Sequence, residues 1–243
     1  MTTSAKNAAK RESGAIRYID RRQIFAEHAF FRGLAAEAIE ELASRSRVEH
    51  HRRGRTIFRK GSAGRSLMAV LQGAVKICTV SRSGREAVLN VIGPGYVFGE
   101  IAVLDGGPRT ADAIAGSDCE ILVLDRRDLV PVMRASPDFA QRLLEILCGR
   151  LRRTSEQLED VFFLDLAGRL AKTLLGPRAG GANGGDETAM SMTQRELGEM
   201  IGTSRESINK QLHKWQREGI VRIAKGKIEV RRRDRLRDLA RQL

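Results

Sequence analysis

The chain has 243 residues, of which 42% are hydrophobic and 30% charged, a composition typical of folded soluble domains and not of a disordered chain. Lys and Arg number 43 against 30 Asp and Glu, and the resulting net charge of +13 favours a polyanionic partner, either nucleic acid or an anionic membrane surface. The apolar runs fall far short of the roughly 18 residues of a membrane span, so this composition excludes a transmembrane protein.

The basic excess lies at the two ends of the chain. Residues 1–60 and 187–243 are positively charged, whereas residues 61–186 carry equal numbers of acids and bases. We therefore expect the C-terminal end, and not the middle, to contact DNA. Residues 1–22 are expected to form a basic N-terminal arm, whose simplest interpretation is a solvated, flexible segment. They lack the apolar stretch of a secretory signal, so we expect a cytoplasmic protein.

Three cysteines, Cys78, Cys119 and Cys148, are scattered and form no CxxC motif. An odd, scattered set is not typical of a disulfide framework or of a zinc or iron–sulfur ligand set. We expect three reduced thiols and no metal.

Residues 54–125 alternate short apolar runs, rich in β-branched residues, with glycines. The runs are LMAVL (67–71), AVKICTV (74–80), AVLNVI (87–92), AIA (113–115) and EILVL (120–124). Short strands at this spacing predict a closed or rolled antiparallel β structure.

Between two of these runs lies the segment FGEIAVLDGGPRTA (98–111). Gly99 permits close approach of the backbone to a ligand, and Glu100 can accept hydrogen bonds from a pair of hydroxyls. Arg109 offers a planar fork of donors suited to a phosphate diester. The same two charges on a short loop are equally compatible with a surface ion pair, so spacing alone leaves both interpretations open.

A long helix is expected next, from the Ser136-Pro137-Asp138 start signal to about Phe163. Its roughly 27 residues span ~40 Å. Along this helix runs a heptad seam with alternating spacings of three and four residues, formed by Leu144, Leu147, Leu151, Thr154, Leu158 and Val161. This seam predicts a coiled-coil dimer. The polar seam position, Thr154, either fixes the register or contacts a ligand at the interface, and Ser155 beside it is exposed or faces the partner.

The segment 98–111 resembles the phosphate-binding cassette of cyclic-nucleotide-binding domains, because its Gly, Glu, Pro, Arg and following small residues match in spacing. The resemblance implies that Glu100 binds the ribose and Arg109 the cyclic phosphate. It also implies that Gly99 and Thr110 add main-chain or hydroxyl contacts, and that Ile101 belongs to the same site.

The segment 150–175 resembles the dimerisation helix and the following helix of the cyclic AMP receptor family of bacterial regulators (the Crp/Fnr superfamily). This resemblance implies that Thr154 and Ser155 contact the base, one from each subunit, and that Arg150 lies near the pocket. It makes a base contact the preferred interpretation of Thr154. The ligand is then cyclic AMP or cyclic GMP, since the Thr110 hydroxyl excludes neither.

The glycine-rich stretch Gly176–Met190 is expected to be a linker that separates a C-terminal module of about 55 residues. Thr193 and Glu196 form a capping-box pattern at the start of a short helix that ends at Gly202. A second helix is expected over residues 203–215, so the pair predicts a helix-turn-helix.

The second helix presents an apolar face of Ile208, Leu212 and Trp215 and a charged face beside it, which suits a DNA major groove. A solvated amphipathic helix is the alternative. The candidate DNA-binding residues are Thr193, Ser204, Arg205, Glu206, Ser207, Asn209 and Lys210, of which Thr193 and Ser204 are expected to hold phosphates at helix N-termini. Residues 220–223 and 227–230 predict a β-hairpin wing, and the tail from Arg231 is a basic helix or a solvated segment.

The module resembles the winged helix of the same family, and SRESINK (204–210) matches its recognition-helix pattern. The resemblance implies that Arg205, Glu206 and Lys210 read base edges in TGTGA-like half-sites, inverted in a dimer. Lys210 departs from the family's arginine, and we expect weaker discrimination there because Lys lacks the fork.

We therefore expect an α+β fold with a cyclic-nucleotide-binding β-roll (23–135), a dimerisation helix (136–164) and a winged helix-turn-helix (165–243). The expected function is a homodimeric transcription regulator whose partners are a cyclic nucleotide, double-stranded DNA and RNA polymerase, with no membrane partner. A hinge is expected near residues 162–165. No catalytic motif indicates an enzyme.

The alternatives are a regulator that is ligand-independent or senses another signal, and a cyclic-nucleotide regulatory subunit that does not bind DNA. An iron–sulfur oxygen sensor is disfavoured because no cysteine precedes Cys78. A haem-based gas sensor would need axial ligands, for which His28, His50 and His51 are the candidates.

Overall fold

The computed structural model describes residues 21–82, 84, 86–176, 189–190, 193–224 and 227–241. Residues 1–20 of the expected N-terminal arm, most of the expected linker and the tip of the C-terminal hairpin lie outside the described residues, whereas Arg21 and Arg22 already belong to the first helix. None of the described helices is long and apolar enough to cross a membrane.

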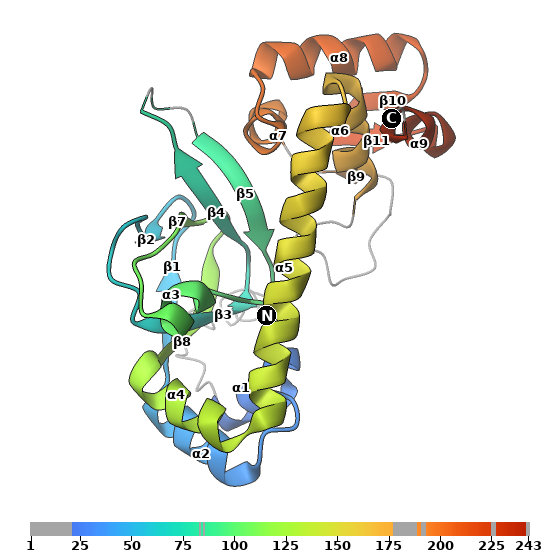
Figure 1. The fold of residues 1–243 in the computed structure, drawn as a ribbon. Coiled ribbons are helices and arrows are strands. Elements are labelled where there is room, and N and C mark those ends of the chain that lie inside the picture. The colour runs from blue at the N-terminus through green and yellow to red at the C-terminus, as the bar shows by residue number, and fades with distance from the viewer. Residues whose placement is uncertain are drawn as a thin grey trace, which may run out of the picture.

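The N-terminal part of the chain is a β-roll flanked by helices (Figure 1). Its helices are α1 (Arg21–Glu27), the short 3-10 helix η1 (Ala29–Phe31), α2 (Ala36–Arg45), α3 (Glu100–Asp105) and α4 (Arg126–Ala135). Its strands are β1 (Arg47–His51), β2 (Thr56–Phe58), β3 (Ser66–Gln72), β4 (Val75–Val80), β5 (Glu86–Ile92), β6 (Val97–Phe98), β7 (Asp112–Ala115) and β8 (Cys119–Asp125).

The strands form two antiparallel sheets, with orders β1-β8-β3-β6 and β2-β7-β4-β5. The first sheet is buried on both faces: in β3, Leu67 and Ala69 pack on the helices, whereas Met68 and Val70 pack on the second sheet. This explains why β3 and β8 read as continuous apolar runs and not as an alternation. The expected rolled antiparallel structure is confirmed.

Helix α5 (Pro137–Phe163) has the bounds that the sequence predicts. Ser136 stands at the N-cap position, but its side chain makes no capping hydrogen bond. Only the first turns of α5 join the core of the β-roll, through Phe139 and Leu143. The rest of the helix extends away to the C-terminal module (Figure 1).

The C-terminal module contains α6 (Leu166–Leu175), α7 (Gln194–Ile201), α8 (Arg205–Arg217), α9 (Arg233–Ala240) and the strands β9 (Ala189–Met190), β10 (Val221–Ala224) and β11 (Lys227–Val230). The expected helix-turn-helix and hairpin wing are confirmed. The expectation that the module begins only after the glycine-rich stretch, with about 55 residues, is wrong, whereas the expected range 165–243 includes α6. Helix α6 precedes that stretch, and its Leu170 and Leu174 share one core with Leu197 and Trp215, because the apolar face of α6 is buried there.

Candidate functional site

The segment 98–111 lies at one end of the β-roll, and its first half contains a helix where the sequence led us to expect a short loop. Strand β6 ends at Phe98, and Glu100 opens α3. Between them Gly99 has a φ of 78°, in the left-handed region that favours glycine. A Cβ at Gly99 would lie 2.4 Å from Nη1 of Arg109, so the close approach also requires glycine.

Arg109 is inside the protein, with 4% of its surface exposed. Its guanidinium donates to the carbonyl oxygens of Gly99 and Ser66, each at 2.8 Å, and to Oγ of Ser66 at 3.0 Å. It also stands 4.2 Å from the centre of the Phe58 ring. Burial lowers the pKa of Arg109, while the carboxylate of Glu100 raises it. A buried guanidinium held in this way is a pre-oriented anion site.

Glu100 is 1% exposed and forms an ion pair with Arg150, which reaches the pocket from α5. Arg150 also donates to the carbonyl oxygen of Val97. The long helix is thereby connected to the acidic residue of the pocket. The sequence predicts that Arg150 lies near the pocket, and the structure brings it into contact with Glu100.

The pocket retains polar atoms that a ligand can use. Among the described residues, both carboxylate oxygens of Glu100 and Nε of Arg109 lack a hydrogen bond of ordinary geometry. A buried carboxylate suits the two hydroxyls of a diol, and a buried guanidinium suits a phosphate diester. The residues present therefore fit a ribose phosphate.

The remaining residues expected at the ligand site are exposed. Ile101 and Thr110 lie on the surface of the segment that carries Glu100 and Arg109. On α5, Thr154 lies one turn beyond Arg150 and donates to its carbonyl at 3.0 Å, and Ser155 donates to the carbonyl of Leu151 at 3.1 Å. Both hydroxyls keep acceptor lone pairs for a ligand.

The expected seam on α5 is largely uncovered. Leu151 is 69% exposed, and Leu144, Leu158 and Val161 are exposed as well, whereas Leu147 is half-buried. Phe162 and Phe163, at the end of α5, extend this apolar stripe, which the heptad pattern did not include.

The helix-turn-helix is built from local signals. Thr193 and Glu196 form the expected capping box of α7, and Ser204 caps α8 by accepting from the amide of Ser207 at 3.1 Å. Helix α8 therefore begins at Arg205, after the cap, and not at residue 203.

Helix α8 has two distinct faces. Ile208, Leu212 and Trp215 are buried, as predicted. The candidate reading residues Arg205, Glu206 and Lys210 are exposed, whereas Ser207 and Asn209 are half-buried. Hydrogen bonds from its own amide and from Ser204 lower the pKa of Glu206, so this carboxylate stays charged and can accept from a base.

Sequence reasoning missed Ser66 and Phe58, which hold Arg109. No local pattern marks them, because Ser66 lies 43 residues from Arg109 in the chain. The bridge between Ala63 and Pro108 brings the chain before Ser66 beside Arg109, and the pairing of β2 with β7 brings Phe58 there.

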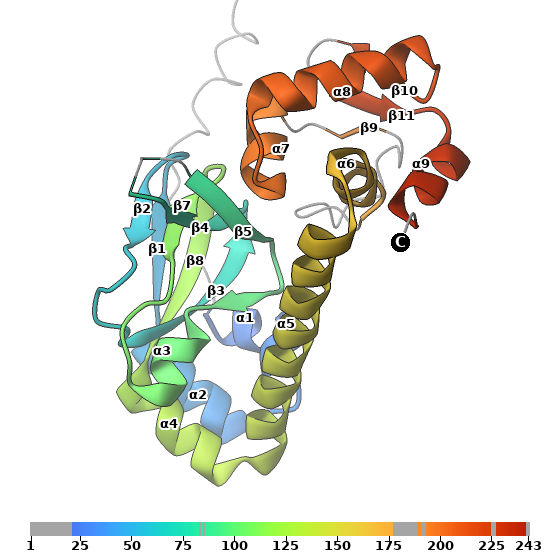
Figure 2. The same cartoon turned by 45° about the horizontal axis from the view of Figure 1, so that its top comes forward.

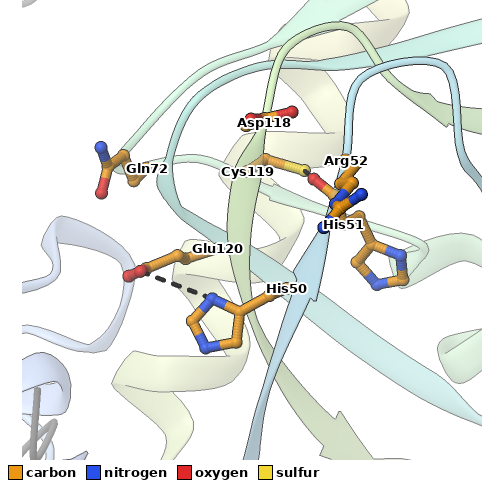
Figure 3. A pocket seen from close by; sticks show the side chains of 7 residues that line it. All are labelled: His50, His51, Arg52, Gln72, Asp118, Cys119 and Glu120. Carbon is orange, nitrogen blue, oxygen red and sulfur yellow. Dashed lines mark hydrogen bonds and ion pairs between the residues drawn. The ribbon is translucent and has the colours of Figure 1, made fainter. Parts of the chain in front are cut away.

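A separate cavity of about 300 Å³ lies at the other end of the first sheet, lined by His50, His51, Arg52, Gln72, Asp118, Cys119 and Glu120 (Figure 3). Its histidines have acidic neighbours: His50 lies 3.5 Å from Glu120, and His51 lies 3.0 Å from Glu49. His28 lies elsewhere, beside the Phe31 ring in the N-terminal core. Within the described ranges no group of three or more His, Cys, Asp or Glu side chains is placed to hold a metal ion.

Two family models match the chain. One, described as a cyclic nucleotide-binding domain, matches residues 48–136, and the other, a Crp-like helix-turn-helix domain, matches residues 168–239. The matched ranges contain the Glu100–Arg109 pocket and helix α8, respectively.

Curated relatives match along nearly the whole chain. The CRP-like cAMP-activated global transcriptional regulator of Mycobacterium tuberculosis is 34% identical over 222 residues, covering 90% of this chain and 99% of the relative. The cyclic AMP receptor protein of Thermus thermophilus is 34% identical over 210 residues, covering 86% and 95%.

Solved structures of related proteins have a similar fold. The Thermus thermophilus catabolite activator protein has a TM-score of 0.50 and 33% identity, covering 87% of this chain and 98% of that one. The c-di-GMP-responsive global regulator CLP of Xanthomonas campestris, at 24% identity, shares the fold with a TM-score of 0.69 over 81% of this chain and 99% of that one.

Proposed function

The chain belongs to the Crp/Fnr family of cyclic-nucleotide-binding, DNA-binding transcription regulators, and from this we propose that it is a homodimer that binds cyclic AMP and then a palindromic operator. Its relatives are transcription regulators, and the chain is likewise a regulator and not an enzyme. One observation carries the proposal: the buried pair Glu100 and Arg109 is connected to the long helix through Arg150.

The ligand is a cyclic nucleotide whose ribose meets Glu100 and whose phosphate meets Arg109. The buried carboxylate of Glu100, whose described partner is the guanidinium of Arg150, and the oriented fork of Arg109 support these roles. Gly99, Ile101 and Thr110 complete the site around the sugar phosphate. The cAMP-activated relatives support cyclic AMP, and cyclic GMP is the second candidate because threonine hydroxyls serve either base.

The dimer forms along α5. Four large apolar side chains on one stripe, Leu144, Leu151, Leu158 and Val161, are exposed in the single chain, and a second copy of the same helix buries them in a coiled coil. Thr154 and Ser155 of the two subunits then meet the base at the interface.

The DNA contacts divide into two kinds. Arg205, Glu206 and Lys210 read base edges in the major groove. Thr193, Ser204, Ser207 and Asn209 position the module, mainly through phosphates. A symmetric dimer places two α8 helices on inverted half-sites about 34 Å apart, one turn of the duplex.

Nucleotide binding is coupled to DNA binding through the C-terminal end of α5. The three parts of the chain have separate roles: residues 23–135 bind the ligand, and residues 136–164 form the dimer. Residues 165–243 read DNA in the cytoplasm and present a surface to RNA polymerase. The chain direction changes between Phe163 and Leu166, where Asp165 caps α6 by accepting from Gly168 at 2.8 Å. A ligand activates the protein to the extent that it binds the DNA-competent arrangement more tightly.

The test is fluorescence anisotropy of a labelled TGTGA-N6-TCACA duplex, titrated with protein alone, with cyclic AMP and with cyclic GMP. We expect tight binding with cyclic AMP and weak binding without it, and no stimulation on a duplex with scrambled half-sites. Equal stimulation by both nucleotides would replace the cyclic AMP assignment with a permissive base site. Binding that ignores both nucleotides would leave a ligand-independent regulator.

The dimer is tested in the same preparation by sedimentation. Leu151→Glu places a charge in the seam and should give a monomer that no longer binds the duplex tightly. Glu145→Leu serves as a control outside the seam. A dimeric Leu151→Glu variant would refute the α5 interface.

A further inference from the structure

The helix-turn-helix module is docked on the β-roll of its own chain through a charged contact. Glu196, in the first turn of α7, lies 3.2 Å from Nζ of Lys76 on β4 and 3.7 Å from a guanidinium nitrogen of Arg53, which follows β1. Lys76 and Glu196 are 120 residues apart in the sequence. Figures 1 and 2 both place α7 beside the β4–β5 hairpin.

The two ion pairs differ in strength because they differ in exposure. The side chains of Lys76 and Glu196 are 20% and 18% exposed, so solvent screens their attraction only in part. Arg53 is 70% exposed, and its longer contact contributes less. Burial raises the pKa of Glu196, but hydrogen bonds from Thr193 and Lys76 outweigh burial and lower it, so the carboxylate is charged near neutral pH.

Beyond these ion pairs, α7 and the β-roll also match in packing and in charge. Helix α7 packs against β5, which is the edge strand of its sheet. Arg195 of α7 pairs with Glu199 at 2.8 Å and is also within the electrostatic range of Glu86 on β5. The contact therefore combines packing with charges of both signs from each side.

The end of α7 that meets the β-roll is the end proposed to meet DNA. The amide and hydroxyl of Thr193 donate to Glu196 within the capping box of α7, at 2.9 and 3.0 Å. The same carboxylate is held by Lys76 of the β-roll. A DNA phosphate at this helix end would have to approach the position that these groups occupy.

We propose that Lys76, Arg53 and Glu196 form an intramolecular latch that holds the DNA-reading module on the β-roll, and that the module leaves this latch when it engages an operator. This inference rests on the proposed function, because it assigns a DNA-binding role to the module. It adds a restraint on the β-roll side, distinct from the nucleotide pocket and from the hinge.

The test alters only the β-roll side of the latch, because Glu196 also caps α7 and its replacement would weaken the helix itself. The variant is Lys76→Met with Arg53→Gln. The matched control is Lys60→Met with Arg55→Gln, which removes the same charge from exposed side chains for which the described residues show no ion pair.

In the full-length protein without nucleotide, we expect the latch variant to bind the operator about three- to tenfold more tightly than the wild type. At saturating nucleotide its affinity should equal that of the wild type, and the control should match the wild type under both conditions. A latch variant that binds no better than the control, or binds more weakly, would overturn the proposal.

Hydrogen exchange provides a readout that needs neither DNA nor nucleotide. Amides of α7 and β5 should exchange about three- to tenfold faster in the latch variant than in the control, because undocking exposes both elements. If the wild type ignores nucleotide, the proposed function fails and the exchange measurement alone decides on the latch. Exchange equal to that of the control would refute the latch whatever the DNA measurement gives.

Discussion

The two candidate sites place their charges in opposite environments. Glu100 and Arg109 are almost completely buried, and their partners Arg150 and Ser66 come from distant elements. On α8, by contrast, Glu206 is exposed and its hydrogen bonds are local. A buried charge depends on the surrounding fold, whereas an exposed charge on a capped helix depends on little beyond that helix. Mutations should therefore separate the two sites.

The largest effect is expected from Arg109→Leu. It removes the buried guanidinium fork, and we expect nucleotide affinity to fall about 100-fold, because charged hydrogen bonds contribute ~1.5–3 kcal/mol each. Arg109→Lys keeps the charge but not the fork and should lie in between. Calorimetric titration with cyclic AMP measures both. Full nucleotide-stimulated operator binding by Arg109→Leu would show that the pocket is misassigned.

A smaller loss is expected from Gly99→Ala. The new methyl group meets Nη1 of Arg109 at a φ of 78°, so the backbone is strained and the guanidinium must move. We expect a loss of stability of about 1–3 kcal/mol, together with weaker nucleotide binding. Urea unfolding measures the first and calorimetry the second. Gly84→Ala is the control, since Gly84 also has a positive φ (78°) but a Cβ there meets nothing within 4 Å.

Glu206→Gln should change DNA preference and leave the pocket intact. An exposed carboxylate that accepts from a base is worth about 1–3 kcal/mol of discrimination. Binding to duplexes that differ at one half-site position should therefore lose selectivity, with nucleotide affinity unchanged. Altered nucleotide affinity with intact base preference would contradict the separation of the two sites.

The smallest effect is expected on stability, when the serines at two helix N-cap positions are replaced. Ser204 accepts from the Ser207 amide, whereas Ser136 makes no capping bond with its side chain. Ser204→Ala should cost ~1 kcal/mol, and Ser136→Ala close to nothing. Thermal unfolding of the two variants side by side measures the difference. Equal losses would mean that the cap hydrogen bond is not what stabilises α8.

The sequence allowed prediction wherever the physical cause is local. The Pro137 start of α5, the Thr193–Glu196 capping box and the apolar face of α8 depend on residues within a few turns of each other. Even there, a residue at the N-cap position did not always form the capping hydrogen bond: the side chain of Ser136 makes none. The glycine-rich stretch was misinterpreted because composition identifies a loop but not the core to which each flanking helix belongs.

By itself the sequence determined the order of the β-roll, the long helix and the helix-turn-helix, the bounds of α5, the two motifs and their resemblance to a known family. Only the tertiary structure decided how Arg109 is held by Ser66 and Phe58, that Arg150 meets Glu100, and that Glu196 contacts Lys76. These contacts join residues that are far apart along the chain. Their free energy arises when sheets and helices pack and remove charges from water, and no spacing rule encodes that event.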